Sequence, residues 1–367
     1  MVHAAGRERL FNDAIRLEQL PGAGVEGRKV LFVTNMWPDE ERPYYGSFIA
    51  SQARSLAEAG TSVDTLYVRG YLGAQAYARA VLALPRVARA RPYDLVHAHY
   101  GHTALASILL RRRPLVVSFC GGDLLGEPAE SGRITHKSRL EVAVFRQVAR
   151  TATVTITKSD EMARALPHSL RERNYVLPNG VDLDAFSPRP RDVARAELGW
   201  EHDGKIILFL GNPDDPRKNV ALAKKASEIV RRTIPSARLH VAWGIGPEEV
   251  PHLMNAADCL LFTSRSEGSP NVVKEAMACA LPIVATPVGD VPERLHGVKN
   301  CFICEPSVEP IAEAVIQALD CDRAPEARAA VEALGIGLVA DRLEHIYNAA
   351  RDLHLSKREV VRDLVEL

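Results

Sequence analysis

Two glutamates, Glu267 and Glu275, bracket the stretch EGSPNVVKE. Turn-forming residues separate them, and an apolar run typical of a helix follows directly. Three kinds of site fit two carboxylates at this spacing. They are an acid and base pair flanking a glycosidic bond, the ligands of a metal ion, and solvated charges placed at the positive end of a helix dipole. The spacing alone leaves all three open.

The residues around the two glutamates predict a strand, a loop and a helix. The apolar run DCLLFTS (258–264) is typical of a buried strand, so Glu267 falls in the loop at its carboxyl end. Ser269 or Asn271 can cap the helix that follows. The free amides and the dipole of such a helix start suit a diphosphate. Glu275, about one turn into the helix, could accept hydrogen bonds from a ribose diol.

A second strand, loop and helix carry two adjacent cations. The run KIILFLG (205–211) predicts a strand, and Arg217 and Lys218 stand where the next helix begins. Cations at a helix start act against its dipole, which makes sense if they hold a phosphate. Solvated surface charges remain an equally good explanation of the pair.

The first half of the chain offers polar residues after predicted strands. In LVHAHYGH, alternation puts His97 and His99 on one face, with His99 nearest the carboxyl end. Asp123 follows the next strand, so a zinc site and a polar cluster lining a substrate cleft both remain open. Gly46 belongs to a long loop after the first strand, where backbone could approach a ligand closely.

Apolar strands and helices alternate twice along the chain. Strands apolar on both faces indicate parallel sheets covered by helices on both sides. We therefore predict two doubly wound α/β domains, at 29–186 and 205–345, joined by a charged, proline-punctuated linker at 187–204. Residues 1–28 are interpreted as an N-terminal extension. In such sheets, ligands bind at the carboxyl ends of the strands.

Composition limits the class of protein and its partners. The 367 residues carry 46 basic and 46 acidic side chains, which argues against a nucleic-acid partner. Residues 1–190 hold 25 Lys and Arg against 19 Asp and Glu, and this basic half favours an anionic acceptor or a peripheral contact with a membrane. With six scattered cysteines and no signal-peptide or membrane-span pattern, we expect a cytoplasmic protein, either soluble or peripheral at the inner face of the membrane.

Several segments together resemble the retaining GT-B glycosyltransferases of family 4. They include EGSPNVVKE with the following AMACALPIVATPVGDVPE, VLPNGVDLDAFSP at 176–188, and ADCLLFTS. FVTNMWPDEERPYYGSFIASQ and DLVHAHYG are similar to segments of that family's first domain. The resemblance runs from about residue 29 to residue 350. It implies two Rossmann-like domains facing across a cleft, with the last helix, 346–367, returning to the first domain.

The resemblance also implies a role for each residue of the predicted site. The second domain would hold a nucleotide-sugar donor, with Glu267 on the sugar hydroxyls and Glu275 on the ribose. Backbone amides at Asn271 and Val272, together with Lys218, would bind the diphosphate. The two carboxylates would then bind opposite ends of one donor molecule and would not form an acid and base pair.

The implied reaction retains configuration and uses neither a metal nor a cofactor. Lys218, Arg217 and the helix dipole would assist departure of the diphosphate. Ser269 and Gly46 are assigned to the donor site as well, and His99 and Asp123 to the cleft that holds the acceptor or the donor sugar. The acceptor would be a sugar, a lipid-linked compound or a small molecule.

Several positions depart from the family pattern, and two of them keep other functions open. Asn212 stands where the family often has an arginine, and Cys120 replaces its usual histidine. A nucleotide-sugar 2-epimerase or a phosphorylase could use the same fold, and a paralogue that only binds its ligand would tolerate both changes. The sequence does not identify the nucleotide.

Overall fold

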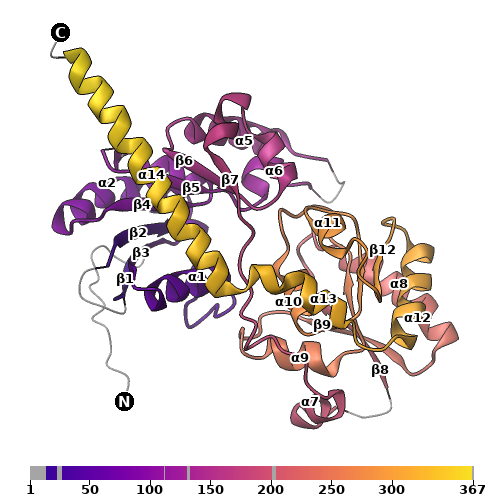
Figure 1. Cartoon of the computed structure of the whole chain (residues 1–367). Helices are drawn as coiled ribbons and strands as arrows, with labels where there is room; N and C mark the ends of the chain where they lie inside the picture. The colour runs from indigo at the N-terminus through magenta and orange to yellow at the C-terminus, as the bar shows by residue number, and fades with distance from the viewer. Residues whose placement is uncertain (1–13, 23–26, 111, 130–132, 201–203, 366–367) are drawn as a thin grey trace.

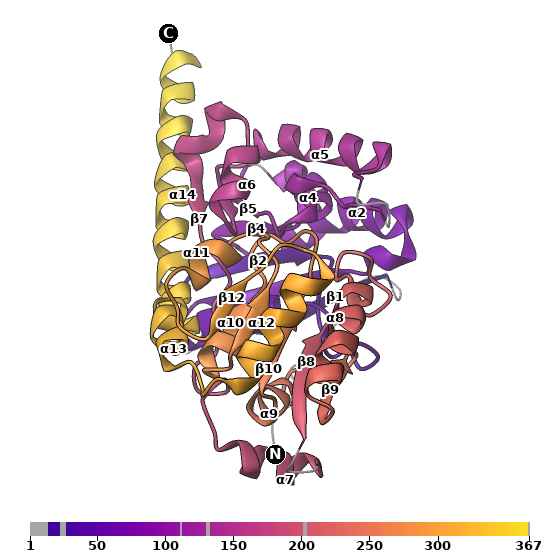
Figure 2. The same cartoon turned by 90° about the vertical axis from the view of Figure 1, so that its right-hand side faces the viewer.

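The computed structural model describes residues 14–22, 27–110, 112–129, 133–200 and 204–365. Its core consists of two β-sheets, each with helices on both faces, as Figures 1 and 2 show. The predicted α/β class with two doubly wound domains is confirmed.

The first sheet has the strand order β1-β3-β2-β4-β5-β6-β7. All neighbouring pairs are parallel except β1 and β3, which are antiparallel. The strands are β1 (Ile15–Leu20), β2 (Lys29–Thr34), β3 (Ser62–Val68), β4 (Leu95–His99), β5 (Leu115–Ser118), β6 (Val154–Thr157) and β7 (Asn174–Val176). The helices between them are α1 (Ser47–Glu58), α2 (Ala74–Ala90), α3 (Gly101–Ser107), α4 (Gly122–Leu125), α5 (His136–Ala149) and α6 (Asp160–Ala165).

The second sheet is entirely parallel, in the order β12-β11-β10-β8-β9. Its strands are β8 (Lys205–Leu210), β9 (Ala237–Ala242), β10 (Cys259–Phe262), β11 (Ile283–Ala285) and β12 (Cys301–Ile303). The helices of this half are α7 (Arg191–Leu198), α8 (Val220–Thr233), α9 (Val250–Ala256), α10 (Asn271–Ala278), α11 (Val291–Leu295), α12 (Val308–Asp320) and α13 (Pro325–Val331).

The strand order of the second sheet fixes where its ligand site must lie. Strand β8 pairs with β9 on one side and with β10 on the other, so the connections leave β8 and β10 toward opposite faces. Such a topological switch point leaves a crevice at the carboxyl ends of the two strands. The loops that follow β8 and β10 contain Lys218 and Glu267, so topology alone brings these distant residues to one crevice.

The burial of the strands explains why their sequences are almost wholly apolar. In β4 and β10 every residue is buried, and in β2 only Lys29 is exposed. A strand covered by helices on both faces has no solvent side, so both sets of alternating side chains must be apolar or paired. The polar exceptions in β4, His97 and His99, are buried with hydrogen-bond partners.

The chain passes between the two domains near Val181 and again near Ile336, and these two segments are hydrogen-bonded to each other. Val181 donates a backbone hydrogen bond to Leu334 (2.9 Å), and Ile336 donates one to Val181 (2.8 Å). From there α14 (Ile336–Val365) runs back along the first domain, as Figure 1 shows in yellow. The hydroxyl of Tyr347 in α14 lies 2.7 Å from Nδ1 of His97 in β4, so the last helix is anchored to the first sheet.

The predicted domain limits stay a prediction, but the elements near them are clear. Residues 15–20, within the predicted extension, form edge strand β1 and pair with β3. The predicted linker contains α7, whose Arg195 lies 2.6 Å from Asp258 of the second domain. The last helix begins at Ile336, ten residues before the predicted limit at 346.

Candidate functional site

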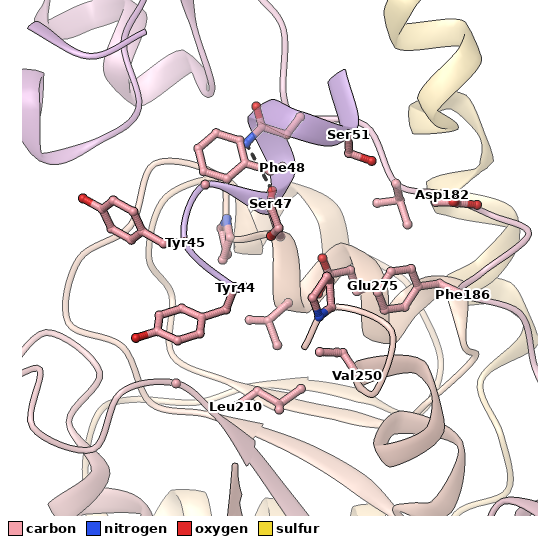
Figure 3. Close-up of a pocket in the computed structure, with 18 of the residues that line it drawn as sticks. Tyr44, Tyr45, Ser47, Phe48, Ser51, Asp182, Phe186, Leu210, Val250 and Glu275 are labelled. Atoms are coloured by element: carbon pink, nitrogen blue, oxygen red, sulfur yellow. Dashed lines mark hydrogen bonds between the residues drawn. The ribbon is translucent and has the colours of Figure 1, made fainter. Parts of the chain in front are cut away.

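A cavity of about 450 Å³ lies between the carboxyl ends of the two sheets. Tyr44 to Phe48, at the start of α1, line it from the first domain, and Leu210, Val250 and Glu275 line it from the second. Figure 3 shows these two groups of side chains around the same space. Seven of the sequence-predicted site residues line this cavity: Glu267, Lys218, Glu275, Ser269, Asn271, Val272 and Gly46.

Glu267 and Lys218 form an ion pair in the cavity. The Lys218 ammonium lies 2.5 Å from Oε1 of Glu267, and the hydroxyl of Ser264 donates to the same oxygen at 3.2 Å. Both side chains are partly exposed, at 24% and 20%. The loops after β8 and β10 therefore present an anion and a cation side by side, available to the hydroxyls and the phosphates of one ligand.

Helix α10 begins at the cavity without a side-chain cap. Pro270 is the capping residue, and no side chain accepts a hydrogen bond from the first turn. The expectation that Ser269 or Asn271 caps the helix is wrong, because both side chains are engaged elsewhere. Ser269 donates to Asp290 (2.8 Å), and Asn271 accepts from Asn179 (3.2 Å). Asn271 and Val272 line the cavity, so the free amides of this turn are left for an anionic ligand.

Glu275 lies one turn further along α10 and has a different environment from Glu267. Burial raises its pKa to about 7, and the neighbouring Lys274 opposes this shift. No hydrogen bond of its carboxylate is found within the described residues. The carboxyl group of Glu275 thus lines the cavity without a protein partner, which suits a ligand that brings hydroxyl donors.

The other three predicted residues lie outside the cavity lining. Arg217 pairs with Asp215 (2.8 Å), although it stands next to Lys218. His99 is buried and lies 3.0 Å from the amide oxygen of Gln52. Asp123 is buried and accepts from the backbone amide of Gly121 (2.9 Å), and burial raises its pKa to about 6.

The structure also tests the zinc site that the sequence left open in the first domain. Among the residues that the structure describes, no group of three or more His, Cys, Asp or Glu side chains could hold a metal ion. His99 instead stacks with His97 (ring centroids 4.1 Å apart), and burial lowers the pKa of both rings well below the usual value. The two histidines are therefore neutral, buried parts of the core of the first domain.

Sequence reasoning missed several residues around the cavity. Lys158 lines it, directly after β6, and is only 2% exposed. Lys274 is buried in α10 and donates to the carbonyl of Asn179 (3.1 Å) and to the hydroxyl of Ser269 (3.0 Å). The signal in both cases was a lysine in an apolar setting, after TVTIT and inside NVVKEAMA.

An aromatic contact between the two domains also lies at the cavity. The rings of Tyr44 and Trp243 lie 4.4 Å apart between centroids, and both residues line the cavity. Trp243 is 45% exposed, which is a large area for an indole. Sequence spacing gave no indication of this pair, because its members are almost 200 residues apart.

The architecture defines the class of protein. Two doubly wound domains that face each other across a cavity form the GT-B fold. Solved structures of this kind match most of the chain. Sucrose-phosphate synthase from Thermosynechococcus elongatus has a TM-score of 0.67 at 16% identity, covering 92% of this chain and 100% of that one. Anabaena Alr3699/HepE, solved in complex with UDP and glucose, has a TM-score of 0.63 at 19% identity, covering 87% and 98%.

Sequence comparisons then identify the family. The model of Glycosyltransferase Family 4 matches residues 20–185, and the model described as Glycosyl transferases group 1 matches residues 243–321. D-inositol 3-phosphate glycosyltransferase 1 of Catenulispora acidiphila is 31% identical over 309 residues, covering 70% of this chain and 72% of the relative. The enzyme of that function from Mycobacterium leprae is 29% identical over 338 residues, covering 79% and 77%.

The chain belongs to glycosyltransferase family 4, and it is a glycosyltransferase. The resemblance and the GT-B fold expected from the sequence are confirmed. None of these relatives is named as an epimerase, a phosphorylase or an inactive binding protein. Within the described residues, no helix is long and apolar enough to cross a membrane.

Proposed function

We propose that the protein transfers a glycosyl group, with retention of configuration, from a nucleoside-diphosphate sugar to an acceptor hydroxyl. One observation carries the proposal. The Lys218–Glu267 pair, the uncapped start of α10 and the unsatisfied carboxyl group of Glu275 all face one cavity at the switch point of the second sheet. A nucleoside-diphosphate sugar has hydroxyls, phosphates and a ribose diol in the same order.

Each group has a proposed role in donor binding. Glu267 accepts hydrogen bonds from the sugar hydroxyls, and Glu275 accepts them from the ribose. The amides of Asn271 and Val272 bind the diphosphate, because a helix start attracts anions. The backbone at Gly46 and the hydroxyl of Ser269 complete the donor site.

The chemical step then breaks the bond between the anomeric carbon and the β-phosphate oxygen. The nucleoside diphosphate leaves with the electron pair, and Lys218 and the α10 dipole stabilise the charge that develops. Arg217 stands next to Lys218 in the chain. It assists this step only indirectly, because its own guanidinium is paired with Asp215. The acceptor oxygen bonds to the anomeric carbon from the same face, and its proton passes to the departing phosphate.

The acceptor belongs to the first domain, on the side lined by the start of α1. Two relatives are named for D-inositol 3-phosphate, so a phosphorylated cyclitol is the first acceptor to test. His99 and Asp123 support this side of the cleft from beneath. A sugar or a lipid-linked compound is the next candidate.

A peripheral membrane contact is part of the proposal for the first domain. Exposed aliphatic side chains lie on α2, α3 and α5 and on the 3-10 turn after α3: Leu82, Leu105, Leu109, Leu140 and Val144. Together with the basic character of this half, they suit an anionic bilayer. Co-sedimentation with vesicles rich in phosphatidylglycerol at low salt tests the contact, and recovery of all protein in the supernatant would exclude it.

The function is tested by binding and by transfer. UDP, GDP, ADP, CMP and TDP are compared for thermal stabilisation of the protein, because a ligand of the native state raises stability according to its affinity. The sugar donor of the nucleotide that binds is then incubated with inositol phosphate and with cell-extract acceptors. We expect Lys218→Ala to lower kcat/KM by roughly 100-fold or more. The exposed Lys225→Ala serves as control, and equal activity of the two variants would contradict the mechanism.

A further inference from the structure

Lys158 is a buried cation at the cavity that the proposed function does not use. It directly follows β6, at the carboxyl end of the strand, and precedes α6, which Ser159 caps. The side chain is 2% exposed and lines the cavity together with Cys120, Ser269 and Asn271. Lys158 therefore belongs to the first domain but borders the same space as the start of α10.

The ammonium of Lys158 has no hydrogen-bond or ion-pair partner within the part of the chain that the structure describes. The charged groups nearest to it do not satisfy it. Burial raises the pKa of the Cys120 thiol to about 12, so this group is neutral. The carboxylate of Asp123 is already occupied by the backbone amides of Cys120 and Gly121. Burial lowers the pKa of Lys158, because Cys120 and Asp123 compensate only part of the lost hydration.

The other two lysines near the cavity both have partners, unlike Lys158. Lys218 is paired with Glu267, and Lys274, which is just as buried as Lys158, donates to Asn179 and Ser269. An unpaired buried ammonium is unfavourable unless an anion is brought to it. A cation kept in this state beside a cavity points to an anion that arrives with the ligand.

The packing of the loops places this anion near α10. The Cys120–Gly121 segment packs against Gly268, where an added Cβ would lie 2.7 Å from the sulfur of Met162 and 3.2 Å from the carbonyl oxygen of Cys120. The loop before α10 is thus in direct contact with the β5–α4 loop and with α6. An anion in front of the first amides of α10 would therefore lie between the two domains, in the cavity that Lys158 also lines.

We propose that Lys158 binds a phosphate group of a substrate, which is held between its ammonium and the free amides at the start of α10. This inference rests on the proposed function and adds a residue of the first domain to it. The phosphate comes either from the diphosphate of the donor or from a phosphorylated acceptor. In both cases Lys158 makes substrate binding depend on the approach of the two domains.

Two variants test the proposal. Lys158→Met keeps the length of the side chain without the charge, and Lys158→Arg keeps the charge. We expect the free Lys158→Met protein to be at least as heat-stable as the wild type, because the unpaired buried charge is gone. This readout shows that the variant is folded and that any loss of binding comes from the missing ammonium.

Titrations with the nucleoside, its monophosphate and its diphosphate then identify the source of the phosphate. If Lys158 holds the donor, Lys158→Met weakens diphosphate binding about tenfold or more and leaves nucleoside binding unchanged. If it holds the acceptor, nucleotide binding is unchanged and the KM for inositol 3-phosphate, but not for inositol, rises by a similar factor. Lys158→Arg retains part of the effect in either case. Unchanged affinity for both substrates, or an equal loss for the nucleoside, would overturn the proposal.

Inorganic pyrophosphate separates this inference from the proposed function. Should the wild type bind no nucleotide and transfer no sugar, the proposed function fails, but pyrophosphate still reports on the anion site. We expect pyrophosphate, or inositol 3-phosphate if the acceptor carries the phosphate, to raise the melting temperature of the wild type and of Lys225→Ala clearly more than that of Lys158→Met. Equal stabilisation of the three proteins by both anions, or of none of them by either anion, would overturn the role of Lys158.

Discussion

At the scale of single residues, the two glutamates of one motif are in different states. Glu267 interacts with Lys218 and Ser264 at the carboxyl ends of the strands of the second sheet. Glu275 has no partner within the described residues, and burial raises its pKa to about 7 from 4.5. It is therefore mostly protonated at pH 6 and mostly ionised at pH 8. Because only the carboxylate accepts two hydrogen bonds from a diol, its role in donor binding depends on pH.

The first prediction concerns this pH dependence. We expect the affinity of the wild type for its nucleoside diphosphate to rise between pH 6 and pH 8 as Glu275 ionises. Glu275→Gln should bind roughly 10- to 100-fold more weakly at pH 8, which corresponds to the loss of a charged hydrogen bond of about 1.5–3 kcal/mol, and its affinity should hardly change with pH. Isothermal titration at several pH values measures both effects.

The exposed Glu228→Gln is the matched control, since it removes a carboxylate from α8 outside the cavity. The stability of the free protein gives an independent check of sign. A carboxyl group whose pKa is raised in the folded state opposes folding once it ionises, so stability falls as pH rises from 4.5 through about 7. The same pH profile of affinity in Glu275→Gln and in wild type would contradict the assignment.

At the scale of elements, the cavity depends on how the loop after β2 enters α1. Gly46 precedes α1 in the left-handed region, with φ 73° and ψ 18°. A Cβ at this position would lie 2.4 Å from the carbonyl carbon of Met36. Glycine therefore allows the chain to turn tightly against its own loop, and this turn sets Tyr44 and Phe48 along the cavity.

The second prediction compares two glycines with similar backbone angles. Gly199 follows α7 with φ 66° and ψ 26°, but a Cβ there would meet nothing within 4 Å. Gly199→Ala should therefore lower the free energy of unfolding by only about 1–2 kcal/mol, the cost of the left-handed conformation. Gly46→Ala should lower it by more and reduce kcat/KM by roughly 100-fold, because the loop must shift.

Urea unfolding and transfer assays on both alanine variants, at a temperature where both are folded, separate strain from function. Loss of activity in Gly199→Ala to the same extent as in Gly46→Ala would show that the turn at Gly46 has no special part in the site.

At the scale of the whole molecule, the last helix connects the two domains. Helix α14 begins next to the crossing at Val181 and runs along the first domain. Its Tyr347 is fully buried and lies 2.7 Å from His97, whose other nitrogen lies 2.8 Å from the hydroxyl of Ser118. Glu344 of the same helix pairs with Arg28 beside the first sheet. The helix thus holds the first domain at a fixed place relative to the crossing.

The third prediction is that Tyr347→Phe destabilises the protein without changing its site. The variant leaves Nδ1 of the buried His97 without a partner, which costs about 1–3 kcal/mol of unfolding free energy. Nucleotide affinity should stay within twofold, because Tyr347 does not line the cavity. Tyr175→Phe, at an exposed ring in β7, should change stability by less than about 0.5 kcal/mol. Equal stability of the two variants in urea unfolding would contradict this role of α14.

Most strands of the two sheets and the loops that carry the site could be predicted from the sequence. Strands buried on both faces must be apolar throughout, so runs such as KVLFVT and DCLLFTS were readable without a structure. The edge strand β1 was not recognised, because its sequence IRLEQL faces solvent on part of its surface and is less apolar. Its pairing with β3 depends on residues almost 50 positions away.

Which side chains face the cavity could not be predicted from the sequence, because it depends on contacts between distant segments. Arg217 and Lys218 are neighbours in the chain, but the first turns to Asp215 and the second to Glu267, which is 49 residues further on. The apolar setting of Lys158 is visible in the sequence, but its lack of a partner is not, since a missing partner is a property of the space around a residue. Composition and spacing specify which groups are present. Burial and pairing, which arise when distant loops meet at a switch point, specify what those groups can bind.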